Sequence, residues 1–404
     1  MQTQCCIVGG GPAGVMLGFL LARAGVQVTV LEKHADFFRD FRGDTIHPST
    51  LELMYELGLL DEFLKLPHQP VSRLKLLLDG QIAYGPDLSD LPTHKKFIAL
   101  MPQWDFLNFI AAQGKRYPHF DLRMGANAET LIMENGAIQG VVANTSHGKL
   151  QIRADLVVAA DGRSSTIRQL AGLQVTDIGA PIDVLWFRLD RPADAPQDVM
   201  GHIKGNRAMV TLFRGDYFQC GLLIHKSGFD EIMQQPLTQF HQLVTAIAPV
   251  FAQTVKSIDN WEKVKLLSVQ INRLSQWHKP GLLCIGDAAH AMSPMGGVGV
   301  NLAVQDAVAT ANLLAEKLRE NRCTDNDLAR LQKRRAWPAY MMQNMQVAAQ
   351  KRIFNGKVTT QPIAISWGTR LFLRLFAPIL RYVMGRVIGL GFRREHIQTV
   401  EFKP

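Results

Sequence analysis

Apolar positions along the chain follow two different periods, and together these periods predict a mixed α/β fold. Short apolar runs at 26–32, 155–162 and 281–287 are typical of buried strands. The last two runs each close on an acid beside a glycine, so the same kind of turn follows a strand twice. A carboxylate after an apolar run is costly to bury unless something bonds to it, which makes both turns candidate ligand sites.

The first 32 residues predict a strand, a glycine turn, a helix and a second strand. The first strand ends at Val8, Pro12 suits the opening turn of the helix, and Gly25 suits its end. Farther along, Ser49 and Glu52 fit a capping box at the start of another helix. The N-terminus is therefore expected to form a βαβ-like unit.

Two later stretches are β-rich, and much of the remaining chain is helical. Residues 71–100 contain short apolar segments around an Asp-Gly hairpin signal, and residues 180–270 contain alternating segments that predict strands. Helices are predicted near 104–113 and 236–247, and a long one begins near Gly299. Because the β-rich stretches interrupt the βαβ-like pieces, we expect two interwoven domains.

Composition limits the class of protein without naming a function. The chain has 404 residues, of which 47% are hydrophobic and 20% are charged, as is ordinary for a globular protein with a sizeable core. Its five cysteines show neither a Cys-x-x-Cys pair nor a metal-ligand spacing, so we expect reduced thiols and no metal site. No signal peptide is visible, and a cytoplasmic protein is expected.

The net charge of +9 is concentrated in the last part of the chain, where ten Lys and Arg residues from Lys351 onward stand against two acids. Arg370, Arg374 and Arg381 share a helical face and interrupt any run long enough to span a bilayer. One interpretation is a basic helix that makes peripheral contact with a membrane. The favoured one is a helix that closes over the domain of the βαβ-like unit, or over a partner subunit as in a homodimer, with the arginines at the rim. No nucleic-acid module is present, so no nucleic-acid partner is expected.

The glycine turn after the first strand has the spacing Gly9-x-Gly11-x-x-Gly14, and Glu32 ends the second strand. Gly9 permits the tight turn, Gly11 lets a pyrophosphate approach the backbone, and Gly14 lets the helix pack closely on the strand. The N-terminus of the helix offers free N–H groups to phosphates, and Glu32 can accept hydrogen bonds from a ribose. The motif predicts a bound dinucleotide and by itself leaves FAD and NAD open.

Two further motifs follow strands: DGRSSTIR at 161–168, and GDAAHAMSPMGGVGVN at 286–301. Together with the N-terminal glycine motif, they resemble the three motifs of the single-component FAD-dependent aromatic hydroxylases, the para-hydroxybenzoate hydroxylase family. The resemblance covers residues 1–320 in order and spacing. The β-rich insertions match only in type, and the chain beyond about 340 matches least.

The resemblance implies an α/β fold in which a Rossmann-like FAD-binding domain is interwoven with a β-sheet substrate domain, followed by C-terminal helices. The implied division assigns 1–70, 101–178 and 271–340 to the FAD-binding domain, 71–100 and 179–270 to the substrate-binding domain, and 341–404 to a C-terminal helical region.

The resemblance also implies how FAD is held without a covalent bond. Asp287 would accept a hydrogen bond from a ribityl hydroxyl, although an N-cap is the structural alternative. Pro294 and the glycines after it would let the isoalloxazine ring lie against main chain, and the helix from Gly299 would point its N–H groups at the ring. Asp161 would contact the pyrophosphate region, or an ion pair with Arg168 would hold it.

Other assignments are carried over position by position. Arg42 would reach an FAD phosphate or lie on the surface, Gln103 would touch the pyrophosphate, the Ala128 backbone would meet the adenine, and Lys33 would cover the adenine or stay in solvent. The residues assigned to FAD are Gly9, Gly11, Pro12, Ala13, Gly14, Glu32, Lys33, Arg42, Gln103, Ala128, Asp161, Gly286, Asp287, Pro294, Gly297, Gly299, Val300 and Asn301.

The implied function is an FAD-dependent, NAD(P)H-driven monooxygenase that hydroxylates a phenolic or polycyclic aromatic molecule. NADH or NADPH would bind transiently, and O2 would form a C4a-hydroperoxyflavin that attacks the ring. The alternatives are a non-oxygenating flavin reductase or dehydrogenase on a related fold, such as a prenyl-chain reductase, and a membrane-surface hydroxylase of a polyprenylated ring. A flavin halogenase is disfavoured because its W-x-W-x-I-P motif is missing.

No catalytic base is assigned from the sequence. The pocket candidates are His47, Arg214, Tyr217 and Pro294, and weaker ones are His202, His225 and His290. Each histidine has a structural alternative. Trp186 and Phe187 either line an aromatic pocket or belong to the core.

Overall fold

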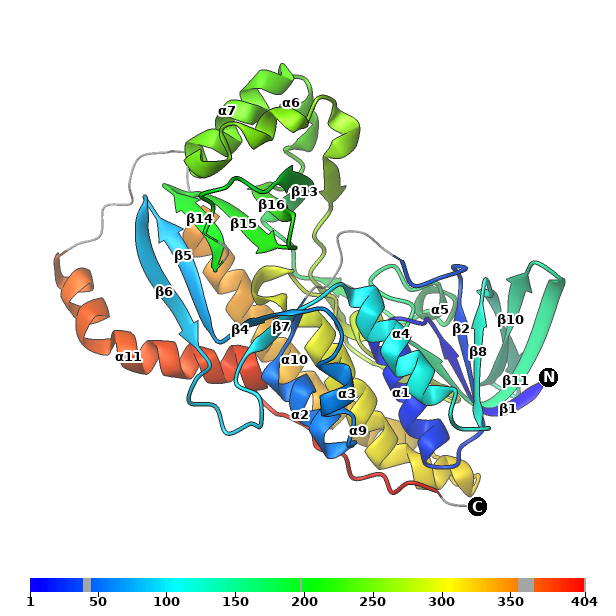
Figure 1. The fold of residues 1–404 in the computed structure, drawn as a ribbon. Helices are drawn as coiled ribbons and strands as arrows, with labels where there is room; N and C mark the ends of the chain where they lie inside the picture. The colour runs from blue at the N-terminus through cyan, green and yellow to red at the C-terminus, as the bar shows by residue number, and fades with distance from the viewer. Residues whose placement is uncertain (39–44, 197, 355–366, 403–404) are drawn as a thin grey trace.

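Two large β-sheets and the helices that cover them make up the protein, and the chain enters each sheet more than once (Figure 1). The computed structural model describes residues 1–38, 45–196, 198–354 and 367–402, with the side chains of all but 84 and 352–374. The eight-stranded first sheet comprises β1 (Gln2–Val8), β2 (Val28–Glu32), β8 (Phe120–Met124), β9 (Asn127–Glu134), β10 (Ala137–Thr145), β11 (Gly148–Ala159), β19 (His278–Lys279) and β20 (Leu282–Cys284).

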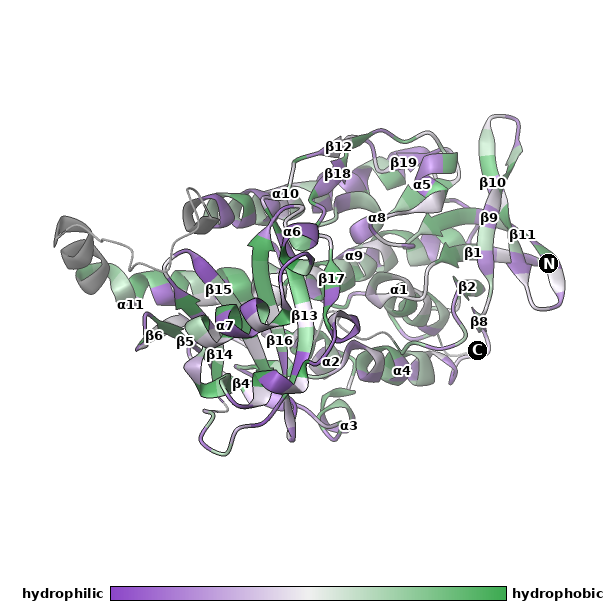
Figure 2. Ribbon diagram, turned by 90° about the horizontal axis from the view of Figure 1, so that it is seen from above, coloured by the Kyte–Doolittle hydropathy of each residue, from purple (hydrophilic) through white to green (hydrophobic). Residues whose placement is uncertain are grey.

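The seven-stranded second sheet has the order β17-β13-β16-β15-β14-β5-β6, and Figure 2 shows it beside the first sheet. Its strands are β5 (Arg73–Leu78), β6 (Gln81–Asp87), β13 (Ile182–Asp190), β14 (Val199–Lys204), β15 (Arg207–Phe213), β16 (Tyr217–His225) and β17 (Lys265–Leu267). Two small sheets pair β3 (Thr45–Ile46), β7 (Ile98–Leu100) and β4 (Gln69–Val71), and β12 (Val175–Asp177) with β18 (Asn272–Leu274).

Helices connect and cover these sheets. The α-helices are α1 (Pro12–Arg23), α2 (Pro48–Glu56), α3 (Leu60–Phe63), α4 (Gln103–Gly114), α5 (Thr166–Leu170), α6 (Phe229–Met233), α7 (Leu237–Ile247), α8 (Asp287–His290), α9 (Gly299–Arg319), α10 (Asp325–Phe354) and α11 (Trp367–Leu390). The 3-10 turns are η1 (Pro249–Phe251), η2 (Thr254–Ser257), η3 (Trp261–Lys263) and η4 (Met295–Gly297).

Five strands of the first sheet run parallel in the order β20-β11-β1-β2-β8. Val8 pairs with Ala159, and Ala159 pairs with Cys284, so β1, β11 and β20 end at one level. These strands are buried on both faces, which explains their nearly continuous apolar sequence. The segments that follow them all leave the sheet at its carboxyl edge, where open α/β sheets bind ligands.

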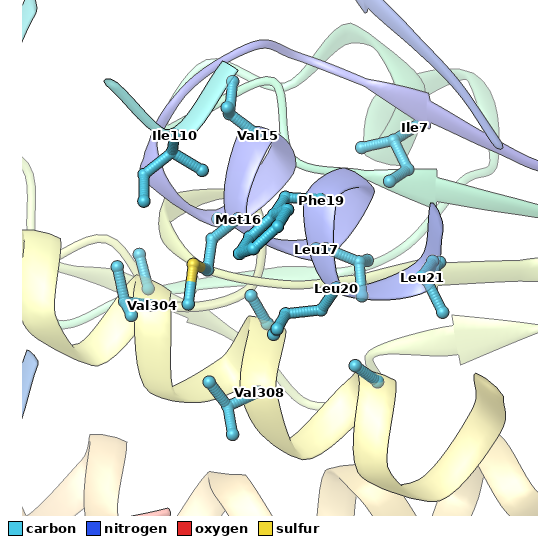
Figure 3. Close-up of a cluster of buried hydrophobic side chains, with 14 of the residues drawn as sticks. Ile7, Val15, Met16, Leu17, Phe19, Leu20, Leu21, Ile110, Val304 and Val308 are labelled. Carbon is cyan, nitrogen blue, oxygen red and sulfur yellow. The ribbon is translucent and has the colours of Figure 1, made fainter. Parts of the chain in front are cut away.

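The core of this domain lies between the first sheet, α1 and α9. Met16 and Leu20 of α1 and Val304 and Val308 of α9 belong to one buried cluster (Figure 3). At Gly18 a Cβ would lie 2.6 Å from the Val30 side chain, so only glycine lets α1 pack this closely on β2. The predicted strand end at Val8 and the helix start at Pro12 are confirmed.

One described helical stretch, Met295–Arg319, is long and apolar enough to cross a membrane, but 83% of its apolar window is buried inside the protein. Most of its buried apolar side chains pack in the cluster that contains α1, and Val298 and Leu302 pack in a second buried cluster. The length and composition of this stretch are therefore explained by its place in the core.

The second sheet has two different faces. Its outer face packs on α7 through aromatic contacts, such as the edge-to-face pair of Phe187 and Phe240. Its inner face, defined here by Trp186, Val210, Leu212, Tyr217 and Gln219, is the opposite one and is turned toward β7 and α11. There Leu212 and Trp186 join a cluster with apolar residues of β7 and α11.

This arrangement decides two alternatives that the sequence left open, for His202 and Phe187, and corrects one prediction, the capping box at Ser49. His202 and Phe187 lie on the outer face and not in a pocket, because His202 packs against Phe251 at a ring distance of 6.1 Å. The capping box at Ser49 is wrong, since α2 begins at Pro48 with His47 as its N-cap. Glu52 instead accepts a hydrogen bond of 2.9 Å from the backbone N–H of His94. The Asp-Gly hairpin between β5 and β6 is confirmed.

A buried network of charged groups ties four segments together below the carboxyl edge of the first sheet. Asp306 of α9 accepts hydrogen bonds from the Gly286 N–H at 3.0 Å, from His290 Nε2 at 2.6 Å and from Arg335 Nε at 2.8 Å. Arg335 also pairs with Glu395 in the C-terminal segment. Although burial would raise the pKa of Asp306, the charges of His290 and Arg335 hold it below its usual value.

We expect Asp306→Asn to destabilise the protein by about 3 kcal/mol, because Arg335 then keeps a buried charge without its acid. Chemical denaturation followed by tryptophan fluorescence measures this change. Glu134→Gln removes an exposed ion pair with Arg153 and serves as the control, with little change expected. An unfolding midpoint of Asp306→Asn equal to that of the wild type would show that the network adds no stability.

Burial lowers the pKa of His202 to about 4. Between pH 6.5 and 4, His202 therefore binds a proton in the unfolded chain but not in the folded chain. The contribution of neutral His202 to the free energy of unfolding is complete above pH 6.5 and is lost as the pH falls. The free energy of unfolding of the wild type should decrease between pH 7 and pH 4.5, and His202→Leu should make this decrease smaller by roughly 2 kcal/mol. Unfolding curves at each pH test this, with the exposed His225→Leu as control. An unchanged pH dependence in His202→Leu would contradict the assignment.

Candidate FAD site and its neighbours

The three sequence motifs meet at the carboxyl edge of the first sheet. The Ala160 N–H donates to the Val8 carbonyl at 2.7 Å, and the Ile285 N–H donates to the Ala159 carbonyl at 3.0 Å. These two bonds extend the pairing of β1, β11 and β20 by one residue. They place the turns at Gly9, Asp161 and Gly286 side by side, although the motifs are far apart in the sequence.

The first turn has the shape that a pyrophosphate requires. A Cβ at Gly9 would collide with the Ala160 carbonyl, and one at Gly14 would collide with the Gly9 carbonyl. At Gly11, by contrast, no atom lies within 4 Å of the Cβ position, so the space in front of this residue is open. Pro12 is the first residue of α1, and Ala13 packs against Gly286 of the third motif. The helix N-terminus therefore faces an open space bordered by small residues.

The predicted adenosine side of the site lies at the end of β2 and the start of β9. Glu32 accepts hydrogen bonds from the backbone N–H groups of Gly10, at 2.9 Å, and His34, at 3.0 Å, which fixes its carboxylate beside the glycine turn. Ala128 is buried on β9, and Lys33 is exposed. Arg42, the predicted phosphate ligand, lies outside the described residues.

Asp161 has one carboxylate oxygen in use and one without a partner. Its Oδ2 accepts from the Ile167 N–H at 3.2 Å, whereas Oδ1 is buried without a hydrogen bond. Burial raises the pKa of Asp161 in spite of the bonds it accepts. The alternative ion pair with Arg168 is not formed, because the Arg168 guanidinium donates to the Ala288 carbonyl at 3.0 Å. Arg168 thus links the second motif to the third.

Asp287 is the first residue of α8, after Gly286 as N-cap, and it makes no capping bond. The N-cap alternative for Asp287 is therefore wrong. Its carboxylate lies 3.8 Å from Arg163 and is 32% exposed, so it can accept a hydrogen bond from a ligand. Gly286 has a φ of 58° and packs between Ala13 and Ala303, which leaves no room for a larger residue.

The loop that leads into α9 combines Pro294, Gly297 and Gly299 with small or buried neighbours. Gly296 and Gly297 have φ values of 79° and 62°, and a Cβ at Gly297 would collide with Thr45. At Gly296 and Gly297 the main chain therefore carries no side chain, as a planar ring lying against it would need. Val300 is buried in the first turn of α9, whose N-terminus follows this loop.

The side chain of Asn301 is used entirely by the protein. Its Oδ1 accepts from the His47 N–H at 2.8 Å and from the Thr50 hydroxyl at 2.7 Å. Its Nδ2 donates to the carbonyls of Thr45, at 3.1 Å, and Gly297, at 3.3 Å. The side chain thus positions the loop, and only the backbone of Asn301 is left for the predicted contact with FAD.

A row of buried glutamines on α10 supports the same loop, and sequence reasoning missed it. Gln343 Nε2 donates to the Ala291 carbonyl at 2.8 Å, and Gln346 Nε2 donates to the Met295 carbonyl at 2.7 Å. Gln350 donates to the Ser293 hydroxyl. The spacing of these glutamines in the sequence could have indicated the row, because they recur every three or four residues and so share one helical face.

Two pocket candidates lie where the second sheet meets α4. Arg214 is in the turn between β15 and β16, close enough to Asp105 of α4 to lower the pKa of that carboxyl, although burial raises it overall. Gln103, the predicted pyrophosphate contact, is the first residue of α4. Tyr217 lies on the inner face, with the Arg188 guanidinium 3.9 Å from its ring centre.

The histidine candidates separate into different roles. His290 is buried in the network with Asp306 and is not a pocket group. His225 is exposed at the end of β16. His47 remains a candidate, because its Nδ1 bonds to the Ile388 carbonyl at 2.7 Å while Nε2 is buried without a partner. Burial lowers the pKa of His47 to about 4, so its ring is neutral at pH 7.

The residues present fit FAD. The open space at Gly11 lies beside the N-terminus of α1, as a pyrophosphate needs. Asp161 Oδ1 and the Asp287 carboxylate can accept hydrogen bonds from a bound ligand. The glycine loop before α9 offers bare main chain to a flat ring.

Comparisons with known proteins agree with this geometry. The model of the FAD binding domain family matches residues 2–344. The 6-methylpretetramide 4-monooxygenase of Streptomyces rimosus is 32% identical over 336 residues, which cover 83% of this chain and 80% of the relative. The rifampicin monooxygenase of Streptomyces venezuelae is 27% identical over 74% of this chain and 61% of the relative.

A solved structure supports the fold. The p-nitrophenol 4-monooxygenase of Pseudomonas putida DLL-E4 matches with a TM-score of 0.76 at 19% identity, over 96% of this chain and 97% of that one. At that identity the likeness shows the fold alone, so the family rests on the match to 2–344 and on the 32% identical relative. The chain belongs to the family of FAD-dependent aromatic hydroxylases, and it is an FAD-dependent monooxygenase with the para-hydroxybenzoate hydroxylase-like fold.

Proposed function

We propose that the enzyme hydroxylates a phenolic or polycyclic aromatic molecule bound against the inner face of the second sheet, with NADH or NADPH as reductant and O2 as oxidant. The observation that carries this location is a pair of buried donors without partners on that face. Trp186 Nε1 and Gln219 Nε2 are both buried and form no hydrogen bond within the protein.

The strand register places these two donors on the same face. Arg188 pairs with Gln219 across β13 and β16, and Trp186 lies two residues before Arg188, so the three side chains point the same way. Leu212 is opposite Gln219 on β15 and adds an apolar surface. Buried polar groups usually have partners, and a ligand with oxygen acceptors and an apolar ring would satisfy both features.

The residues of this chain bind and orient the cofactor and the substrate and shield them from solvent. Bound FAD supplies the reducing equivalents and the oxygen chemistry. The N-terminus of α9 favours negative charge in the space before it, and the glutamine row of α10 keeps the η4 loop in one conformation. Neutral His47 can accept a hydrogen bond at Nε2, because Nδ1 carries the proton that it donates to Ile388.

The relatives support oxygenation rather than reduction alone. Two relatives that match 83% and 74% of this chain are named as monooxygenases, of 6-methylpretetramide and of rifampicin. We therefore place the non-oxygenating reductase or dehydrogenase second. The two hypotheses differ in whether O2 is consumed and whether oxygen enters the product.

The function is tested with the FAD-loaded enzyme, NADH or NADPH, and a panel of phenols, quinolones and polyketide aromatics. We expect at least one compound to stimulate nicotinamide oxidation and O2 uptake, and mass spectrometry to detect a product heavier by one oxygen atom that derives from O2. Oxidation that proceeds equally well without O2, with a reduced product, would favour the reductase instead.

The substrate location is tested by Gln219→Leu, which removes the donor and keeps the approximate volume. Loss of one hydrogen bond to a buried ligand should raise the KM for the stimulating compound about tenfold, with FAD content unchanged. Gln239→Leu is a matched control, because Gln239 is exposed on α7 at the outer face. If both variants keep the wild-type KM, the inner face does not bind the substrate through Gln219.

A further inference from the structure

The C-terminal part of the chain carries charge of one sign. Residues 351–394 contain nine Lys and Arg residues and no Asp or Glu. The chain runs through α11 in this stretch, and Arg381 and Arg386 are both exposed on that helix. Any partner of α11 therefore meets a positive surface.

The last turns of α11 are held firmly on the protein. A Cβ at Gly385 would collide with the Asp87 carbonyl, and one at Gly389 would lie 2.5 Å from the Leu91 side chain. Between these glycines, the Ile388 carbonyl bonds to His47 at 2.7 Å, and Leu390 is buried. This end of the helix packs on β6 of the second sheet as well as on α2, whereas the favoured sequence interpretation expected the flavin domain or a partner subunit.

The preceding turns of α11 expose apolar side chains instead. Figure 1 shows this part of the helix reaching past β6 at the edge of the molecule, and Figure 2 shows hydrophobic and hydrophilic positions mixed along it. The exposed fractions are 64% for Leu375, 43% for Phe376, 58% for Ile379, 39% for Leu380 and 47% for Val383. Five large apolar residues within nine positions form an exposed patch, called the 375–383 surface below.

We propose that the 375–383 surface lies in the headgroup region of an anionic membrane, to which the enzyme binds peripherally. Basic side chains next to exposed leucine and phenylalanine are typical of helices that lie in the membrane interface. The arginines attract anionic lipids, and the apolar side chains enter the acyl boundary. Because the docked end at Gly385 and Gly389 anchors the helix to β6 and to the segment after it, the helix lies on the membrane and does not cross it.

A second copy of the chain fits this surface less well. A two-fold interface sets the same patch against itself, so the arginines of both copies would approach one another. The helix itself offers no acid to pair with these arginines, since residues 351–394 contain no Asp or Glu. An anionic lipid surface satisfies both the charge and the apolar side chains at once.

The proposal is tested by cosedimentation of the FAD-loaded enzyme with vesicles of phosphatidylcholine alone or with 30% phosphatidylglycerol. Binding should be at least tenfold stronger with phosphatidylglycerol and should weaken about tenfold between 0.1 and 0.5 M NaCl. No turnover is measured, so this result is independent of the proposed substrate and reaction.

The variant Leu375→Ser/Ile379→Ser should lose vesicle binding at least tenfold and keep its FAD content and thermal midpoint, since both side chains are mostly exposed. Val400→Ser is the matched control, because Val400 is 81% exposed away from α11. Absence of binding to either vesicle would overturn the proposal. So would a wild-type dimer in light scattering that the double variant converts to a monomer, because the surface would then be an interface between copies.

Discussion

The structure depends on the common level at which β1, β11 and β20 end. Parallel pairing of Val8 with Ala159 and of Ala159 with Cys284 fixes the register, and each strand is followed at once by a glycine-containing turn. A slip of one residue would send buried side chains to the opposite face, so the apolar core enforces this register. The three turns are therefore brought together by sheet packing, before any ligand contributes.

Polar bonds then hold the turns in the conformation that the register allows. Arg168 donates to the Ala288 carbonyl, Asp306 accepts from the Gly286 N–H, and Gln346 donates to the Met295 carbonyl. Buried charged and amide groups are costly unless they are paired, so these contacts favour one arrangement over nearby alternatives. The supports come from α5, α9 and α10, which makes the site a property of the whole FAD-binding domain.

Local signals were sufficient for the elements around the three motifs. The strand end at Val8, the helix start at Pro12 and the hairpin at Asp79 each depend on neighbours within a few residues, and all three are confirmed. The capping box failed because Pro48, which suits the first turn, moved the helix start ahead of Ser49. Competing local signals of this kind are resolved only by the surrounding structure.

Distant contacts could not be predicted from spacing. Asp306 bonds to groups 16, 20 and 29 residues away, and Gln346 bonds to carbonyls 51 and 53 residues away. Alternation in β13 predicted a strand but not which face meets the FAD-binding domain, so Trp186 and Phe187 looked equivalent. The fold separates them, with Trp186 on the inner face and Phe187 in the outer core. The contacts with FAD that the resemblance assigns to residues such as Gln103 and Ala128 stay predictions.

The measurement that tests the account most directly is FAD retention by the purified protein. The wild type should be yellow and bind FAD without a covalent bond, and Asp287→Ala should weaken FAD binding at least tenfold while its circular dichroism stays that of the wild type. Asp259→Ala, an exposed acid of the second domain, should bind FAD normally. A correctly folded wild type that is colourless and does not bind added FAD would contradict the account.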